Sequence, residues 1–89
     1  MIERELIVSN RLGLHARATA KLVQLLSQYR SSCTLTAKGR EVNAKSIMGV
    51  MLLAAGQGTA VRLRVEGEDE QDAADAVSAL FDRRFDEGS

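Results

Sequence analysis

The only histidine of the 89-residue chain, His15, lies in the stretch RLGLHARATAK, two residues before Arg17. The pattern predicts that a helix begins at Ala16, with His15 at its N-cap position. The backbone amides of Ala16, Arg17 and Ala18 then lack partners within the helix and point past the imidazole. Such amides bind anions, and the Arg17 guanidinium can hold an oxyanion through two hydrogen bonds. These residues therefore predict an anion site beside His15.

The imidazole of His15 adds a nucleophile to this anion site. The ring is nucleophilic when it is neutral, and the positive end of a helix disfavours its protonated form. The anion could then be a phosphoryl group carried on the ring itself, held by charge-assisted hydrogen bonds of about 1.5–3 kcal/mol each. Those energies position the group without trapping it. From these residues alone, an ordinary capping or surface histidine is the alternative interpretation.

Other kinds of chemistry have little support in the sequence. One histidine and one cysteine without ligand spacing do not predict a metal site. The chain has no glycine-rich nucleotide loop and no recognisable pair of carboxylates in an apolar setting. We therefore expect no metal and no cofactor, and a protein that is not a self-sufficient enzyme.

The composition is typical of one globular domain spanning residues 1–89. The longest apolar run is too short to cross a bilayer, and the single Cys33 suits a reducing cytosol. Residues 1–45 carry eight Lys and Arg against three Asp and Glu, whereas residues 46–89 carry four against nine. We expect a cytoplasmic monomer that binds neither nucleic acid nor membrane; its basic first half could present a basic face to an acidic protein. Two merely solvated surfaces are the alternative.

The elements that would position His15 follow from the hydropathy pattern. Alternation predicts strands over residues 3–9, 32–37, 40–44 and 60–66, and helical spacing predicts helices over residues 16–28 and over about 15 residues after an N-cap at Asp69. The predicted buried stripes are Ala18, Leu22, Leu25, Leu26 and Tyr29 on the first helix and Ala73, Ala76, Val77, Leu80 and Phe81 on the last. This order predicts an α+β sandwich, with one helical layer on a four-stranded antiparallel sheet. The tail FDEGS is expected to fray.

The segment AKSIMGVM predicts a short, unusually apolar helix with Ser46 as its N-cap. Val50 and Leu53, three residues apart, share a face that is expected to reach the core. Ile47, Met48 and Met51 share another face, and exposed methionine-rich surfaces are typical of partner sites. The alternative is that a loop covers this face or that it belongs to the core.

Phosphorylation of Ser46 would add about two negative charges at a helix N-terminus, where they are locally favourable. The phosphate would therefore not unfold the helix. It would act outward, by repelling an acidic partner and covering part of the apolar face. The residues Ser-Ile-Met alone do not predict such a modification.

The motifs LGLHARATAK, AKSIMGVMLL, QGT and GEDEQ occur here in the order of the HPr family, and nearly the whole chain resembles that family. These proteins are the histidine-containing phosphocarriers of the bacterial phosphotransferase system. The resemblance implies an open-faced β-sandwich with strand order 1-4-2-3 and helices on one face. It also implies that His15 accepts a phosphoryl group on Nδ1 from phosphorylated enzyme I, with phosphoenolpyruvate upstream, and passes it to a histidine of an EIIA-type protein.

The resemblance extends to the other candidate residues. Arg17 matches the phosphate-site arginine of the family, and Ser46 matches a serine that an ATP-dependent HPr kinase/phosphorylase modifies in some lineages. The set Ile47, Met48 and Met51 matches the docking surface for enzyme I and that kinase. One position departs from the family, because Ala18 stands where a proline is usual. Phosphotransfer is expected to survive this change, since proline in a first helical turn forms no helical hydrogen bond.

Two further questions stay open at the level of sequence. The sugar-transport branch and the nitrogen-related branch of the system both fit: LLAAGQGT and the acidic tail resemble the second, and KSIMGVM resembles carriers under kinase control. A different class of function is a regulatory binding domain that is never phosphorylated. Such a domain would dock through the same apolar helix without a reactive His15.

Overall fold

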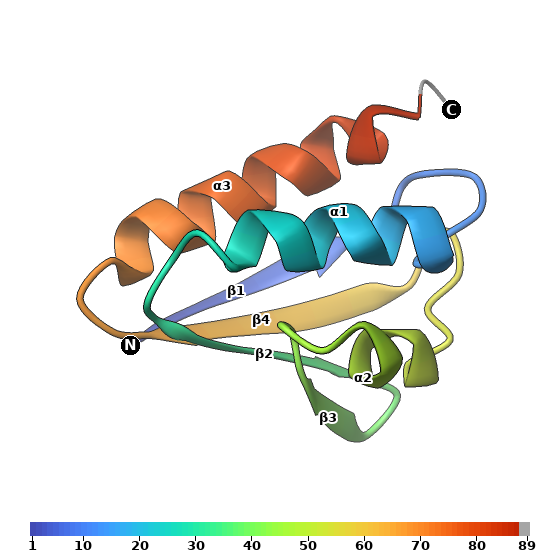
Figure 1. Ribbon diagram of the computed structural model, residues 1–89. Helices are drawn as coiled ribbons and strands as arrows, with labels where there is room; N and C mark the ends of the chain where they lie inside the picture. Colours follow the sequence, from blue (N-terminus) through green and yellow to red (C-terminus); the bar gives the residue numbers. More distant parts are fainter. Residues whose placement is uncertain (88–89) are drawn as a thin grey trace.

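The alternation in AVRLRVE builds the central strand β4 (Ala60–Glu66) of the computed structural model, which describes residues 1–87. β4 lies between β1 (Ile2–Ile7) and β2 (Ser32–Ala37), and β3 (Arg40–Asn43) pairs with the other side of β2. Every pairing is antiparallel, and the strand order is β1-β4-β2-β3 (Figure 1). The predicted sheet and its predicted strand order are confirmed.

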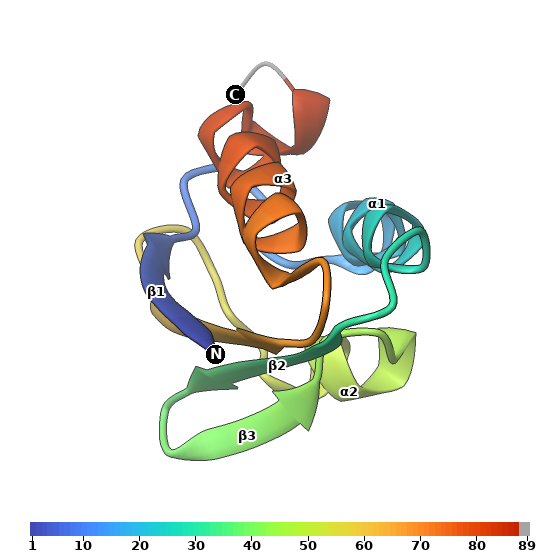
Figure 2. The ribbon, with the colours of Figure 1, turned by 90° about the vertical axis from the view of Figure 1, so that its left-hand side faces the viewer.

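The three helices cover one face of this sheet. α1 (Ala16–Leu26) and α3 (Glu70–Asp82) lie side by side across it (Figures 1 and 2). The short α2 (Ile47–Leu52) packs beside α1 and β3. Val50 of α2 and the adjacent Leu53 belong to the same buried cluster as the other two helices. The predicted single helical layer is confirmed.

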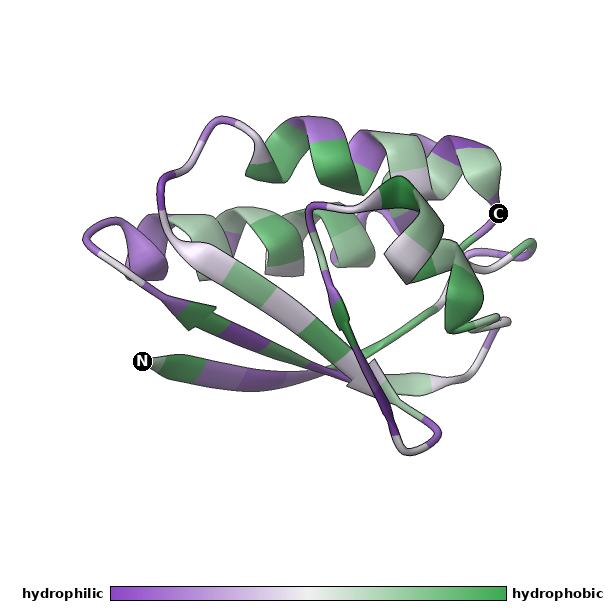
Figure 3. Cartoon of the chain, turned by 60° about the horizontal axis from the view of Figure 1, so that its bottom comes forward, coloured by the Kyte–Doolittle hydropathy of each residue, from purple (hydrophilic) through white to green (hydrophobic). Residues whose placement is uncertain are grey.

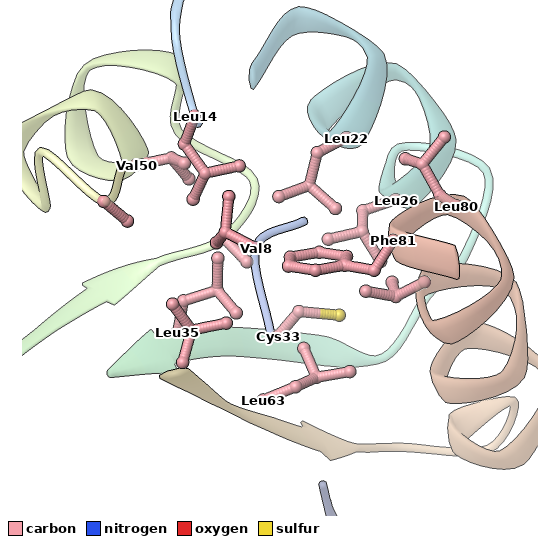
Figure 4. Packing of buried hydrophobic residues seen from close by; sticks show 14 of the residues in the cluster. Val8, Leu14, Leu22, Leu26, Cys33, Leu35, Val50, Leu63, Leu80 and Phe81 are labelled. Atoms are coloured by element: carbon pink, nitrogen blue, oxygen red, sulfur yellow. The ribbon is translucent and has the colours of Figure 1, made fainter. Parts of the chain in front are cut away.

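The core fills the space between the helices and the inner face of the sheet. Leu22 and Leu26 of α1 belong to the same buried cluster as Leu35 of β2 and Leu63 of β4, whose register places these two opposite each other; Val8 and Phe81 lie in the same cluster (Figure 4). Hydrophilic and hydrophobic residues alternate along the strands (Figure 3). This period of two sends one set of side chains into the core and the other set to solvent.

The outer face of the sheet is charged, and no helix within residues 1–87 covers it (Figure 2). Arg64 of β4 lies opposite Glu3 of β1 in register, and its Nε donates to the Glu3 carboxylate over 3.1 Å. A second carboxylate, from Glu41 of β3, lies 3.9 Å from Arg64 Nη1. Cross-strand pairs of opposite charge are favourable on a sheet surface.

Several predicted details are wrong. α1 ends at Leu26, because later amides bond to the carbonyl three residues back instead of four. The Gln28 N–H, for example, donates to the Leu25 carbonyl. Leu25 and Tyr29 are only partly buried, and Thr19 joins the buried stripe instead. On α3, which spans 13 residues, Ala74 is buried and Ala76 is not.

Asp69 stands at the N-cap position of α3, as predicted, but its side chain does not cap that helix. Its carboxylate instead accepts hydrogen bonds from the Arg30 amide at 2.8 Å and from the amide and hydroxyl of Ser31. Asp69 therefore ties the loop before β2 to the loop before α3. Tertiary contacts outweigh the local capping preference at this position.

The prediction of a fraying tail is wrong for Phe85 to Glu87. Phe85 is fully buried, and its ring centroid lies 4.9 Å from that of Phe81. The short 3-10 helix η1 (Arg84–Asp86) follows α3, with left-handed φ angles of 55°, 55° and 61° at its three residues. An aromatic side chain that fills the core holds this segment in place. Gly88 and Ser89 lie outside the described residues.

Candidate functional site

The loop before α1 is shaped by Gly13 and Asn10. Gly13 has a φ of +70°, and a Cβ atom there would lie 2.5 Å from the Ala55 carbonyl oxygen. The next residue, Leu14, donates its amide to that same oxygen over 2.9 Å. The buried Asn10 closes the loop, because its Nδ2 donates to the Gly13 carbonyl over 2.8 Å. These hydrogen bonds of Gly13 and Leu14 thus fix the backbone directly before His15.

His15 occupies the N-cap of α1, where its backbone is extended. Its carbonyl accepts the first bond of the helix, from the Thr19 amide at 2.9 Å. Its Nδ1 atom accepts a hydrogen bond from the Arg17 amide at 3.2 Å. The ring therefore serves as the cap, and Nδ1 directs its lone pair at the positive end of the helix.

Because the ring caps α1, one of the backbone amides expected to bind an anion already has a partner. The sequence predicts that the amides of Ala16, Arg17 and Ala18 are free to bind an anion. In the structure, the Arg17 amide already donates to the ring. A group bonded to Nδ1 would enter the space between them, so the same amide could then donate to an oxygen of that group. The arrangement keeps a donor ready at the atom where the charge would arrive.

A hollow of about 730 Å³ opens beside the ring. It is lined by Arg11, Leu12, His15, Ala16, Arg17, Lys21, Asp86 and Glu87. Its three cationic side chains suit a dianionic phosphoryl group. Arg17 is exposed, and its guanidinium forms no ion pair within residues 1–87. Ala18 turns the other way and is fully buried in the core.

Glu87 is the residue of this site that the sequence did not reveal. Its Oε2 lies 2.6 Å from His15 Nε2, and its Oε1 accepts from Asn10 Nδ2 over 3.0 Å. The hydrogen bond from Asn10 lowers the pKa of this carboxyl, with a smaller lowering from His15. Glu87 is 72 residues away from His15 in a tail that was expected to fray. The available signal was Phe85, an aromatic residue that needs a buried position.

α2 presents the exposed apolar face that the sequence predicts. Val50 and Leu53 are buried, whereas Met48 is 77% exposed and Ile47 and Met51 are 45% and 44% exposed. Two further leucines that were not predicted are exposed: Leu52 of the same helix at 61%, and Leu12 in the loop before α1 at 67%. We call Leu12, Ile47, Met48, Met51 and Leu52 the apolar surface. Figure 1 shows α2 at the same end of the molecule as the start of α1.

Ser46 takes the predicted N-cap position of α2. Its Oγ accepts a hydrogen bond from the Gly49 amide at 3.1 Å. The side chain is partly exposed, so solvent can reach the hydroxyl. The predicted capping role of Ser46 is confirmed, whereas the predicted modification stays a prediction.

Residues 1–87 contain no group of three His, Cys, Asp or Glu side chains that could hold a metal ion. None of the helices in that range is both long enough and apolar enough to span a membrane.

The open-faced β-sandwich thus presents a single histidine at a helix start, beside a cationic hollow that suits a covalently held anion. The family model described as "PTS HPr component phosphorylation site" matches residues 2–83. The chain is 68% identical over 87 residues to a phosphocarrier protein HPr of Xylella fastidiosa, covering 98% of each protein. It is 39% identical to a phosphocarrier protein NPr of Shewanella violacea, covering 99% of this chain and 97% of that protein.

Solved structures agree with this assignment. The HPr of Thermoanaerobacter tengcongensis superposes with a TM-score of 0.94 at 41% identity, covering 98% of each chain. The chain belongs to the HPr family of phosphocarrier proteins of the phosphotransferase system.

Proposed function

We propose that His15 accepts a phosphoryl group on Nδ1 from phosphorylated enzyme I and passes it to an EIIA-type protein. The observation that carries the proposal is the direction of Nδ1, which points at the Arg17 amide and the positive end of α1. A phosphoryl group on Nδ1 would meet backbone amides and lie beside a cationic hollow. Membership in the HPr family supports the same reaction.

Arg17 has the geometry of a phosphate holder in this proposal. Its side chain is exposed at the rim of the hollow and is not committed to an ion pair within residues 1–87. A guanidinium can then grip two phosphoryl oxygens when they arrive. The backbone amides of Ala16 and Arg17 complete the binding shell, whereas the burial of Ala18 leaves its amide a weaker candidate.

Incubation with labelled phosphoenolpyruvate and purified enzyme I tests the carrier function. We expect acid-labile, alkali-stable label on the wild-type protein and none on His15→Ala, while Arg17→Ala takes up label more slowly. Addition of an EIIA-type protein should then remove the label. A wild-type protein that stays unlabelled would reject the carrier and favour the alternative, a regulatory domain that only docks through the apolar surface.

The apolar surface is the proposed docking site for enzyme I. α2 lies at the same end of the molecule as the start of α1 (Figure 1), where the partly exposed His15 is the N-cap, and Leu12 also lines the hollow beside the ring. A partner seated on α2 would therefore reach His15 without a change of fold. Met48→Asp should weaken binding to enzyme I by about tenfold or more. The control Ala79→Asp adds the same charge at an exposed position of α3, and an equal loss in both variants would contradict the proposal.

Ser46 is the proposed site of regulatory phosphorylation by an HPr kinase/phosphorylase. The partly exposed hydroxyl caps α2 directly before Ile47 and Met48, so a phosphate there adds negative charge at the rim of the apolar surface. ATP and the kinase should give acid-stable label that Ser46→Ala does not take up. A demonstrably active kinase from the same organism that leaves the wild-type protein unlabelled would overturn this role.

The branch of the system can be tested with two acceptors. The NPr relative supports the nitrogen-related branch, and the HPr relatives support the sugar branch. Phosphorylated protein should be offered to a sugar-specific EIIA and to a nitrogen-related EIIA in separate reactions. The acceptor that is labelled with the higher kcat/KM identifies the branch. The reaction is expected in the cytoplasm, where the single Cys33 stays reduced.

A further inference from the structure

We infer that Glu87 is a positioning residue for phosphotransfer, which keeps a proton on His15 Nε2 and thereby leaves the lone pair of Nδ1 free to react. This inference rests on the proposed phosphorylation of His15. The match to the family model covers residues 2–83, so the acid that contacts the ring lies outside the matched residues.

Hydrogen-bond partners on both sides of the ring select one tautomer. An ionised carboxylate can only accept, and Glu87 Oε2 lies 2.6 Å from Nε2, so Nε2 carries the proton and donates. A backbone amide can only donate, and the Arg17 amide points at Nδ1 over 3.2 Å, so Nδ1 is the acceptor. The two contacts agree with each other, and both leave Nδ1 unprotonated.

The carboxylate of Glu87 is itself held in a fixed orientation. Asn10 Nδ2 donates to Glu87 Oε1 over 3.0 Å and to the Gly13 carbonyl over 2.8 Å. Because a carbonyl only accepts, the Asn10 amide cannot be turned around without losing the bond to Gly13. Asn10 is fully buried, and its Oδ1 has no hydrogen-bond partner among residues 1–87. A buried polar atom without a partner is costly, which is consistent with a functional constraint on this side chain.

The charges around Glu87 favour its ionised form. The pKa of its carboxyl is lowered, chiefly by the hydrogen bond from Asn10, which outweighs the opposing effect of burial; His15 and Lys21 lower the pKa further. Arg11 and Arg17 line the same hollow, and Asp86 is the other acid there. Asp86 is engaged with Arg83 at 2.9 Å. The Glu87 side chain is only 13% exposed, so water competes little for its contact with the ring.

The backbone that delivers Glu87 is strained. Three consecutive residues that are not glycine have left-handed φ angles: 55° at Arg84, 55° at Phe85 and 61° at Asp86. Left-handed backbone is unfavourable for such residues and persists only where the surroundings enforce it. Here the buried Phe85 ring and the bond from Lys21 Nζ to the Phe85 carbonyl, at 2.7 Å, enforce it. Without this turn the chain would not bring its acid back to α1.

The proton on Nε2 stays in place through both transfers. In the first, the Nδ1 lone pair forms the N–P bond while the bond between phosphorus and the donor breaks, and its electron pair leaves with the donor. The ring becomes a phosphoimidazolium whose Nε2–H faces the carboxylate. In the second, the N–P bond breaks as the acceptor attacks, and its electron pair returns to Nδ1. The ring is then neutral again with the same proton, so neither step needs a proton from solvent.

Two substitutions at residue 87 separate this role from a structural one. In Glu87→Gln, Asn10 Nδ2 still requires an oxygen opposite it, so the new amide nitrogen faces His15 Nε2 and donates to it. Accepting at Nε2 moves the ring proton to Nδ1, which blocks attack and sacrifices the hydrogen bond from the Arg17 amide. Glu87→Ala leaves Nε2 to water and imposes neither tautomer. We therefore expect glutamine to slow phosphorylation by enzyme I by about tenfold or more, and alanine to slow it less.

The tautomer can be measured directly, because His15 is the only histidine in the chain. ¹⁵N NMR of histidine-labelled protein should give an Nε2–H ring in the wild type, a shift towards Nδ1–H in Glu87→Gln, and an intermediate ratio in Glu87→Ala. Glu87→Asp should restore part of the rate and the wild-type tautomer. The control is Asp82→Asn, which removes an exposed acid at the end of α3, and should change neither readout.

Each outcome of these measurements decides the inference. An unchanged tautomer ratio in Glu87→Gln, or equal rates for the glutamine and alanine variants, would overturn it. Circular dichroism and thermal unfolding establish that each variant is folded before it is scored. If enzyme I fails to label the wild type, the proposed function fails, whereas the NMR result still tests whether Glu87 sets the tautomer.

Discussion

Lys21 Nζ donates a hydrogen bond to the Phe85 carbonyl oxygen over 2.7 Å, which ties α1 to the turn that follows α3. Phe85 itself fills a fully buried position against Phe81. The last described residues therefore belong to the core, and they also carry an acid to the histidine. Stability and site geometry are linked at this end of the chain.

Phe85→Ala should be strongly destabilising for this reason. Truncation of a buried phenylalanine leaves a cavity and typically costs about 3–5 kcal/mol. Urea unfolding should show a lower midpoint, and the ¹⁵N signals of His15 should move towards those of Glu87→Ala, because the turn no longer holds the acid in place. A loss below about 1 kcal/mol would mean that the tail does not pack as described.

Gly13→Ala should disturb the loop that presents His15. The new Cβ would lie 2.5 Å from the Ala55 carbonyl oxygen and 2.7 Å from Gly56 Cα, at a φ of +70°. We expect a loss of about 1–3 kcal/mol in the free energy of unfolding. Gly39→Ala is the matched control, because Gly39 has a φ of +76° with nothing within 4 Å of its Cβ. If the two variants lose equal stability, backbone conformation alone explains the effect and the clash at Ala55 is unimportant.

Ala18→Pro should be tolerated, although the residue is fully buried. The first bond within α1 runs from the Thr19 amide to the His15 carbonyl, so a proline one residue earlier removes no helical bond. We expect a change in stability within roughly 1 kcal/mol and phosphorylation by enzyme I at a similar rate. Ala20→Pro, inside the helix, should instead cost about 3 kcal/mol or more. A large loss in Ala18→Pro would show that the local backbone has adapted to alanine.

Asp69 should make stability depend on pH in the acidic range. The Ser31 hydroxyl and the Arg30 amide hold the pKa of its carboxyl below the usual range. A carboxyl whose pKa is lowered on folding contributes stability above its unfolded pKa of about 3.9, and this contribution disappears as pH falls through the folded pKa. Ser31→Ala should raise the pKa of Asp69, as followed by NMR titration. The stability gap between wild type and variant should be constant above about pH 5 and should narrow on acidification; a gap that is independent of pH would contradict this account.

Much of the fold follows from the sequence alone. The alternation in AVRLRVE gives β4 with its bounds, and SCTLTA gives β2, because period two reports directly which face is buried. The division of α2 into a buried and an exposed face also follows from spacing. The end of α1 does not, because a tightened last turn depends on backbone hydrogen bonds that spacing does not encode.

The site is predicted less completely than the fold. His15 and Arg17 are close in sequence, so one helix start is enough to bring them together. Glu87 reaches the ring only because Phe85 packs on Phe81 and the backbone turns left-handed. A left-handed turn without glycine has no local signal, since propensities predict against it. Contacts that join the two ends of a chain are therefore the hardest part of such a site to predict.

The charged outer face of the sheet has a consequence for solubility. Four strands with one bare face could stack on the bare face of another molecule, as β-sheets do when both surfaces are apolar. Here the exposed strand positions carry Glu3, Glu41 and Arg64 in cross-strand ion pairs. Stacking would have to desolvate all of these charged side chains. The bare face thus resists self-association at high protein concentration, while contacts with other proteins are left to the end of the molecule that carries His15.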